Sequence, residues 1–194
     1  MRQLAAALLT SSVLAFPQLA QAVPIAVDFA GVFNGTVVPS TPSDISQSSS
    51  FTFVPGGTWQ VSSVASTGNN TGVAVGSTIG LPVGTFGFNL GAQFTKTFTG
   101  SGGNAFSEAL TIVSVNRASP NFFNATAIGT ATQTAGTGFD PTAVLFSLTL
   151  TQAGAFASTA AAFSDASRPI PEPATLGLLG AGLLGLGLVR RRRG

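Results

Sequence analysis

Hydrophobic and polar residues alternate with a period of two along much of this chain. The clearest case is VLFSLTLTQ, residues 144–152, where Phe146, Leu148 and Leu150 share one face and serine and threonine occupy the other. Successive side chains of a β-strand point to opposite faces, so this pattern predicts a half-buried strand.

One charged residue interrupts the pattern. In QFTKTFT, residues 93–99, Lys96 falls on the same face as Phe94 and Phe98. A lone lysine is seldom buried, so the sequence predicts that Lys96 lies at a sheet edge or a strand end with its amine solvated. It is the chain's only lysine, and no Ser-x-x-Lys pattern surrounds it, which argues against a Ser-Lys catalytic dyad.

Other short apolar or alternating segments are separated by turn signals such as Pro55-Gly56-Gly57 and Pro120-Asn121, with a Gly-Ser-Gly-Gly hairpin loop at residues 100–103. The further strand candidates are residues 25–33, 50–54, 58–65, 72–79, 84–90, 107–115, 124–133 and 154–163. About ten short strands at this spacing predict an all-β body, an antiparallel β-sandwich or a jelly-roll-like fold.

Three segments have a different composition. The Ser/Pro-rich residues 40–50 are expected to form a long surface loop, and residues 164–173 a linker. The Ala-rich residues 157–163 are compatible with a helical turn as well as with a strand.

Composition points to a core built mainly from phenylalanine. Of the 16 phenylalanines, all but Phe16 lie in residues 23–168, together with Trp59. The chain has no cysteine, so hydrophobic burial must stabilise the body without disulfides. Residues 23–168 carry a net charge of −2, and the pI near 10.5 therefore comes from Arg2 and the C-terminal arginines. No basic cluster in the body indicates a nucleic-acid partner.

Few residues of the body could carry chemistry. The absence of histidine and cysteine from the sequence excludes Ser-His and Cys-His dyads and the commonest zinc ligands. Two carboxylates could act on a glycosidic bond, but the spacing of Asp28, Asp44, Glu108 and Asp140 selects no pair. We therefore expect that the chain is not an enzyme and has no metal, cofactor or catalytic residues.

Threonines recur at alternate positions on predicted polar faces: Thr95, Thr97 and Thr99, and again Thr149 and Thr151. Regular threonine rows on a flat sheet can present methyl and hydroxyl groups to ice or carbohydrate. The runs are short and do not repeat at a fixed interval. An ordinary solvent-facing sheet surface has the same composition, and we favour that interpretation.

The N-terminal residues 1–22 have the features of a secretory signal peptide. Arg2 precedes a short apolar run, and Ala20 and Ala22 form the small-x-small pattern that signal peptidase cleaves. Cleavage after Ala22 would leave Val23 as the mature N-terminus.

The C-terminal residues 169–194 combine three features. Pro171, Glu172 and Pro173 predict an extended, exposed peptide, because each proline fixes φ and disfavours helix before it. Residues 174–189 contain no charge and predict an apolar transmembrane helix slightly shorter than the usual ~20 residues. The helix is followed by a cytoplasmic stop-transfer cluster, Arg190, Arg191, Arg192 and Arg193.

A secretory signal together with Pro-Glu-Pro, an apolar helix and terminal arginines resembles the PEP-CTERM sorting proteins of bacteria with an outer membrane. The resemblance implies export, transient anchoring in the inner membrane, and processing near Pro-Glu-Pro by an exosortase-type membrane protease. It also implies that the gene for this protein lies near exopolysaccharide genes. The same tail is catalogued as an ice-binding-protein C-terminal motif, a label for the sorting segment that need not describe the body.

The sequence therefore predicts three segments: a signal peptide (1–22), a β-rich exported body (23–168) and a PEP-CTERM anchor (169–194). The expected function is a structural or adhesive protein of the cell surface or extracellular matrix, as in a biofilm. Its expected partners are signal peptidase, the exosortase-type protease, the inner membrane and exopolysaccharide. The alternative is a carbohydrate- or ice-binding surface module.

Overall fold

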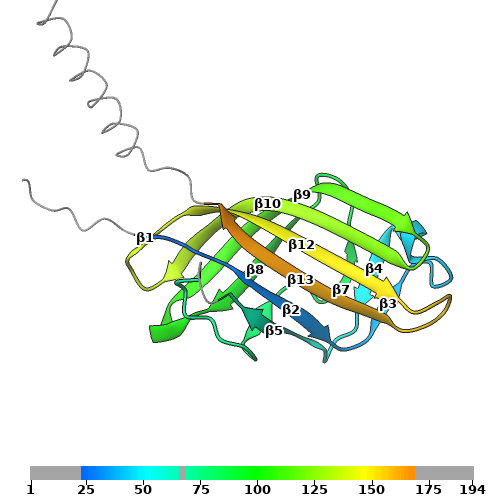
Figure 1. Ribbon diagram of the computed structural model, residues 1–194, viewed down its shortest axis with the longest axis horizontal. Helices are drawn as coiled ribbons and strands as arrows, with labels where there is room; N and C mark the ends of the chain where they lie inside the picture. Colours follow the sequence, from blue (N-terminus) through cyan, green and yellow to red (C-terminus); the bar gives the residue numbers. More distant parts are fainter. Residues whose placement is uncertain (1–22, 66–68, 169–194) are drawn as a thin grey trace, which may run out of the picture.

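The computed structural model describes residues 23–65 and 69–168 and shows that the chain is all-β there (Figure 1). The first strands are β1 (Val23–Pro24), β2 (Phe29–Asn34), β3 (Val37–Pro39), β4 (Ser50–Phe53), β5 (Thr58–Val64), β6 (Thr78–Gly80) and β7 (Gly84–Gly87). They are followed by β8 (Gln93–Thr99), β9 (Ala105–Ser119), β10 (Phe122–Ala135), β11 (Phe139–Asp140), β12 (Thr142–Gln152) and β13 (Thr159–Arg168). Two short 3-10 helices, η1 (Ile45–Gln47) and η2 (Ser101–Gly103), lie between strands.

Eight strands close into an antiparallel barrel. Their order is β12-β10-β9-β8-β6-β5-β2-β13, and β13 pairs back onto β12 from Ala143↔Arg168 to Gln152↔Thr159. Figure 1 shows β2, β13 and β12 running side by side along one wall. The prediction of an antiparallel all-β body is confirmed. The sandwich or jelly-roll form is not observed, because β13 is hydrogen-bonded on both sides and joins what would have been two separate sheets.

Two smaller groups of strands flank the barrel. β3, β4 and β7 extend the sheet from β13 through the pair Thr159↔Val37. β1 pairs in parallel with β11, and the Val23 amide donates a hydrogen bond of 2.9 Å to the Gly138 carbonyl. The residue that signal-peptide cleavage would leave first is therefore attached to the barrel.

The period-two pattern correctly predicted which side chains face inward. Along β12, Val144, Phe146, Leu148 and Leu150 are buried, and the residues between them are more exposed. Phenylalanines from different strands meet in the interior; for example, the Phe29 and Phe98 ring centroids lie 5.3 Å apart. The predicted phenylalanine core is present, and it fills the barrel.

The barrel strands are longer than the sequence pattern suggested: β9 has 15 residues, β10 has 14 and β12 has 11. The segment predicted as a strand at residues 72–79 is mostly irregular, with a turn at residues 75–76, and contributes only the start of β6. Residues 159–168 form one strand, so the predicted linker begins too early and the Ala-rich segment is not helical.

The predicted surface loop at residues 40–50 is instead held against the barrel. Ile45 is completely buried, and the Asp44 side chain accepts a hydrogen bond from the Ser46 amide at the start of η1. The Arg117 guanidinium donates to the Ser46 and Ser48 carbonyls and lies 5.0 Å from the Phe123 ring centroid. This loop is therefore a packed part of the structure.

Replacing Arg117 with Ala should loosen this segment, because the Ser46 and Ser48 carbonyls lose a charged donor. We expect backbone amides of residues 45–48 to exchange with solvent about tenfold faster, as a lost charged hydrogen bond implies. Hydrogen exchange with mass spectrometry measures the effect, and Arg117→Lys should give an intermediate rate. Unchanged exchange in Arg117→Ala would show that apolar packing alone holds the loop.

Across residues 23–65 and 69–168, no helix has the length and apolar character needed to cross a membrane. The predicted signal peptide, transmembrane helix, sorting motif and arginine cluster lie outside the described residues.

Candidate functional site

Three charged side chains meet inside the barrel. Lys96 comes from β8, Glu108 from the neighbouring β9 and Asp165 from β13, and the side chains of all three are fully buried. Lys96 and Glu108 are directly paired across the two adjacent strands. β13 is four strands from β8 in either direction around the barrel, so Asp165 reaches the lysine from the opposite wall.

The lysine amine contacts both carboxylates. Lys96 Nζ lies 2.8 Å from Glu108 Oε2 and is in direct contact with Asp165 Oδ2. Within the part of the chain that the structure describes, Glu108 Oε1 and Asp165 Oδ1 have no hydrogen-bond partner. A buried oxygen without a hydrogen-bond donor lowers the stability of the folded state. The three side chains, if they remain separate ions, therefore lack the hydrogen bonds needed to offset their burial.

Phenylalanine rings surround the amine. Lys96 Nζ lies 4.6 Å from the Phe29 ring centroid, 5.1 Å from that of Phe98, and 5.7 and 5.8 Å from those of Phe163 and Phe146. These rings offer cation–π attraction but no hydrogen-bond acceptor. The cluster is therefore an isolated polar site within an apolar core.

This environment shifts the pKa of both Lys96 and Glu108. Burial lowers the pKa of Lys96 from 10.5 to about 8, and the charge and hydrogen bond of Glu108 only partly oppose that shift. Burial likewise raises the pKa of Glu108, against the opposing effect of Lys96. Both shifts favour the neutral forms, an amine and a carboxylic acid.

The sequence correctly placed Lys96 on the apolar face but was wrong to predict a solvated position at an edge or strand end. Lys96 stays buried because two carboxylates face it, and Asp165 lies 69 positions away in sequence. Asp165 falls within residues 164–173, the predicted linker, and was therefore not expected to face the lysine. One feature of the sequence could have indicated the cluster. Each of the three charged residues lies two positions from a core phenylalanine, on the inward face of a strand whose apolar and polar residues alternate.

The carboxylates considered for glycosidic chemistry do not form one site. Glu108 belongs to the buried cluster, Asp44 caps η1, Asp28 precedes β2, and Asp140 is exposed on β11. No group of three His, Cys, Asp or Glu in the described ranges is arranged to hold a metal ion.

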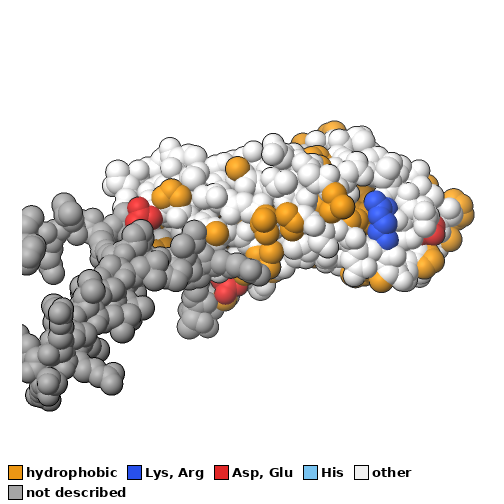
Figure 2. Space-filling view, turned by 90° about the horizontal axis from the view of Figure 1, so that it is seen from above, with side chains coloured by type: hydrophobic (Ala, Val, Ile, Leu, Met, Phe, Trp, Pro, Cys, Tyr) orange, Lys and Arg blue, Asp and Glu red, His pale blue; other side chains and the backbone are white. Residues whose placement is uncertain are grey.

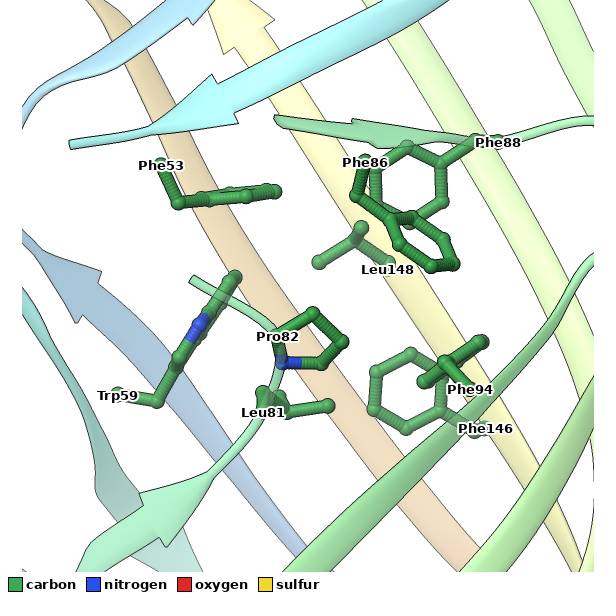
Figure 3. Close-up of a pocket in the computed structure, with 9 residues that line it drawn as sticks. All are labelled: Phe53, Trp59, Leu81, Pro82, Phe86, Phe88, Phe94, Phe146 and Leu148. Carbon is green, nitrogen blue, oxygen red and sulfur yellow. The ribbon is translucent and has the colours of Figure 1, made fainter. Parts of the chain in front are cut away.

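A second interior feature is an apolar cavity beside the cluster's aromatic surroundings (Figure 3). Its volume is about 10 Å³, room for at most one water molecule. Its lining residues are all apolar or aromatic: Phe53, Trp59, Leu81, Pro82, Phe86, Phe88, Phe94, Phe146 and Leu148. Figure 3 shows these side chains converging on the space from several strands. The cavity is too small to hold a ligand.

The outer wall is mostly uncharged. Thr95, Thr97 and Thr99 are all exposed on β8, as their spacing predicted. Their partners on β9 are alanine and serine, so the threonine row is only one strand wide. Figure 2 shows one face of the body, on which charged side chains are sparse among polar, uncharged and apolar ones.

A shallow groove lies on this wall between β8 and β9. Its volume is about 250 Å³, and it is lined by Gln93, Phe94, Thr95, Ala109, Leu110 and Thr111. Gln93 and Thr95 face outward and offer amide and hydroxyl groups that can contact sugars, whereas the Phe94 ring packs inward against Phe86 and Phe146.

The body is a closed all-β module with a buried charged cluster in its interior. Residues 169–193 match the family model described as the PEP-CTERM protein-sorting motif. Searches of curated proteins and of solved structures each gave no match. The chain thus carries a PEP-CTERM sorting motif at its C-terminus, as its Pro-Glu-Pro, apolar and arginine segments indicated. The motif implies an exported protein, sorted at the membrane through its C-terminus and processed by an exosortase.

Proposed function

We propose that this chain is a structural or adhesive protein of the bacterial surface or extracellular matrix, and that it has no enzymatic activity. The observation that supports a non-catalytic role is the filled interior. The cavity described above holds at most one water molecule, and the Lys96–Glu108–Asp165 cluster is sealed from solvent.

The outer wall supports a role in contact with other matrix components. Its exposed positions carry mainly threonine, serine and alanine, and charges are few on the face that Figure 2 shows. Such a surface offers hydroxyl groups to polysaccharide and is little affected by ionic strength. Exopolysaccharide is accordingly the proposed partner outside the cell.

The proposed route has two processing steps. Signal peptidase cleaves after Ala22 during export, and the apolar residues 174–189 then hold the protein transiently in the inner membrane. An exosortase-type protease cuts near Pro171-Glu172-Pro173, and the body passes to the cell surface or medium. The PEP-CTERM match at residues 169–193 supports this route.

A cell-attachment assay tests the structural or adhesive role. In a host that carries an exosortase and makes exopolysaccharide, cells producing the chain should retain more matrix and attach better than cells without it. A second strain producing the chain without residues 169–194 should lose this effect, because the body is no longer sorted. Equal attachment and matrix retention in the presence and absence of the chain would contradict the proposed role.

A carbohydrate-binding module is a second candidate, favoured by the groove between β8 and β9. If it applies, the purified protein should co-sediment with an insoluble polysaccharide such as cellulose, and Thr95→Lys should abolish binding by filling the groove. Thr149→Lys on β12, outside this groove, is the matched control. Absence of co-sedimentation, or equal binding by both variants, would exclude polysaccharide binding in this groove. A parallel assay with ice crystals measures affinity for ice.

A further inference from the structure

The contact between Lys96 and Asp165 places a nucleophile against an acyl group. A primary amine touches a carboxyl group, a second carboxylate lies 2.8 Å from the amine, and all three side chains are sealed from solvent. We propose that Lys96 Nζ and Asp165 Cγ become joined by an intramolecular isopeptide bond, with Glu108 as the catalytic residue that carries the protons.

The fold provides the proximity that such a reaction needs. Lys96 and Asp165 project toward each other from opposite walls, and the surrounding phenylalanine rings prevent either from moving away. Holding two reactants at contact distance can be worth an effective concentration on the order of 10⁵–10⁸ M. No external enzyme is required.

Atoms and charges balance with water as the only product besides the amide. The Lys96 ammonium gives one proton through Glu108 to the Asp165 carboxylate, leaving a neutral amine and a carboxylic acid. The Nζ lone pair attacks Cγ and forms the C–N bond. A second proton then passes from Nζ through Glu108 to the departing oxygen, the C–O bond breaks, and water leaves. Glu108 ends as it began, and the Lys96 and Asp165 charges have cancelled.

The apolar surroundings favour each step. Burial lowers the pKa of Lys96 to about 8. The neutral, nucleophilic form of its amine is therefore populated far more than in a solvated lysine. Burial raises the pKa of Glu108, so this carboxyl group can hold a proton in transit. The amide product replaces a buried ammonium and a buried carboxylate with one neutral group, which removes a large desolvation cost.

The bond would join opposite walls of the barrel, because Lys96 is on β8 and Asp165 is on β13. Lys96 and Asp165 are 69 positions apart, and β13, which carries Asp165, ends at Arg168 directly before the sorting motif. A covalent tie there fixes the strand through which the membrane segment pulls on the body. It also supplies the cross-link that a cysteine-free exported protein cannot obtain from a disulfide.

Peptide mapping of the full chain, purified in detergent from a host without an exosortase, tests the bond. Trypsin cuts after Lys96, Arg117 and Arg190 in an unlinked chain, whereas the Arg168–Pro169 bond resists it. We expect no cleavage after Lys96, and residues 118–190 joined to the peptide that contains Lys96, with a combined mass lower by one water. Complete cleavage after Lys96 with residues 118–190 as a separate peptide would overturn the proposal.

Amine labelling under denaturing conditions gives an independent readout. Lys96 is the only lysine, so an unlinked chain has two amines to label, the lysine and the N-terminal α-amine. We expect label at the α-amine alone. Stoichiometric label on Lys96 would show that the amine is free.

Variants assign the roles of the carboxyl groups. Asp165→Ala removes the acyl group and should abolish the link, whereas Asp140→Asn, which changes an exposed carboxylate, should leave it intact. Glu108→Gln cannot carry protons and should slow linkage by about 10²–10⁴-fold, the usual contribution of general acid–base catalysis. A link that persists in Asp165→Ala, or forms at the normal rate in Glu108→Gln, would contradict the assignments.

Discussion

Replacing Asp165 with Ala should lower the free energy of unfolding of the exported protein by about 4 kcal/mol. Cross-linking positions 69 residues apart removes roughly that much loop-closure free energy from the unfolded chain. Breaking up a buried charge group has a cost of similar size, about 3–5 kcal/mol, when one partner is removed. Small domains are stable by only about 5–15 kcal/mol, so the variant should be marginal.

Urea unfolding monitored by Trp59 fluorescence measures this effect, because Trp59 is buried and is the only tryptophan. Asp140→Ala, which removes an exposed carboxylate, is the matched control and should change stability by less than about 0.5 kcal/mol. If Asp165→Ala and Asp140→Ala unfolded at the same urea concentration, the buried cluster would contribute nothing to stability.

The second large effect concerns sorting. Replacing Glu172 with Ala, or both Pro171 and Pro173 with Ala, should leave the full-length protein in the inner membrane of a host that carries an exosortase. Proline fixes φ and favours an extended backbone, the form in which a protease can bind a peptide as a strand, and Glu172 is the charged residue between the two prolines. Deleting residues 190–193 should instead release or mislocalise the protein, because these arginines resist passage through the membrane.

Cell fractionation with immunodetection of the body distinguishes these outcomes. The natural chain in a host without an exosortase is the control and should resemble the Glu172→Ala variant. Normal release of Glu172→Ala and of the double proline variant would show that the protease does not recognise this tripeptide.

Local patterns in the sequence predicted much of the strand content. The alternation in residues 144–152 correctly placed Phe146, Leu148 and Leu150 in the core, because the side-chain period of a strand is fixed by its backbone. Barrel closure could not be predicted in this way. It depends on β13 pairing with both β12 and β2, and no local signal distinguishes a strand with two partners from an edge strand.

The buried cluster shows the same limit for the candidate site. The pattern placed Lys96 on the inner face, but the usual cost of burying a charge argued for an edge position. That cost is offset by Glu108 and Asp165, and only the three-dimensional structure brings Asp165 across the barrel to the lysine. By contrast, the sorting motif was recognisable because its chemistry is contiguous in sequence.

A top-down mass spectrum of the protein recovered outside an exosortase-carrying host tests the processing and the internal bond together. Fragment ions give both termini, and the intact mass reports any lost water. We expect a chain that begins at Val23, lacks residues 174–194, and is lighter by one water than the same chain without the Lys96–Asp165 bond. A recovered chain that still ends at Gly194, or that has the full mass of the unlinked chain, would contradict this expectation.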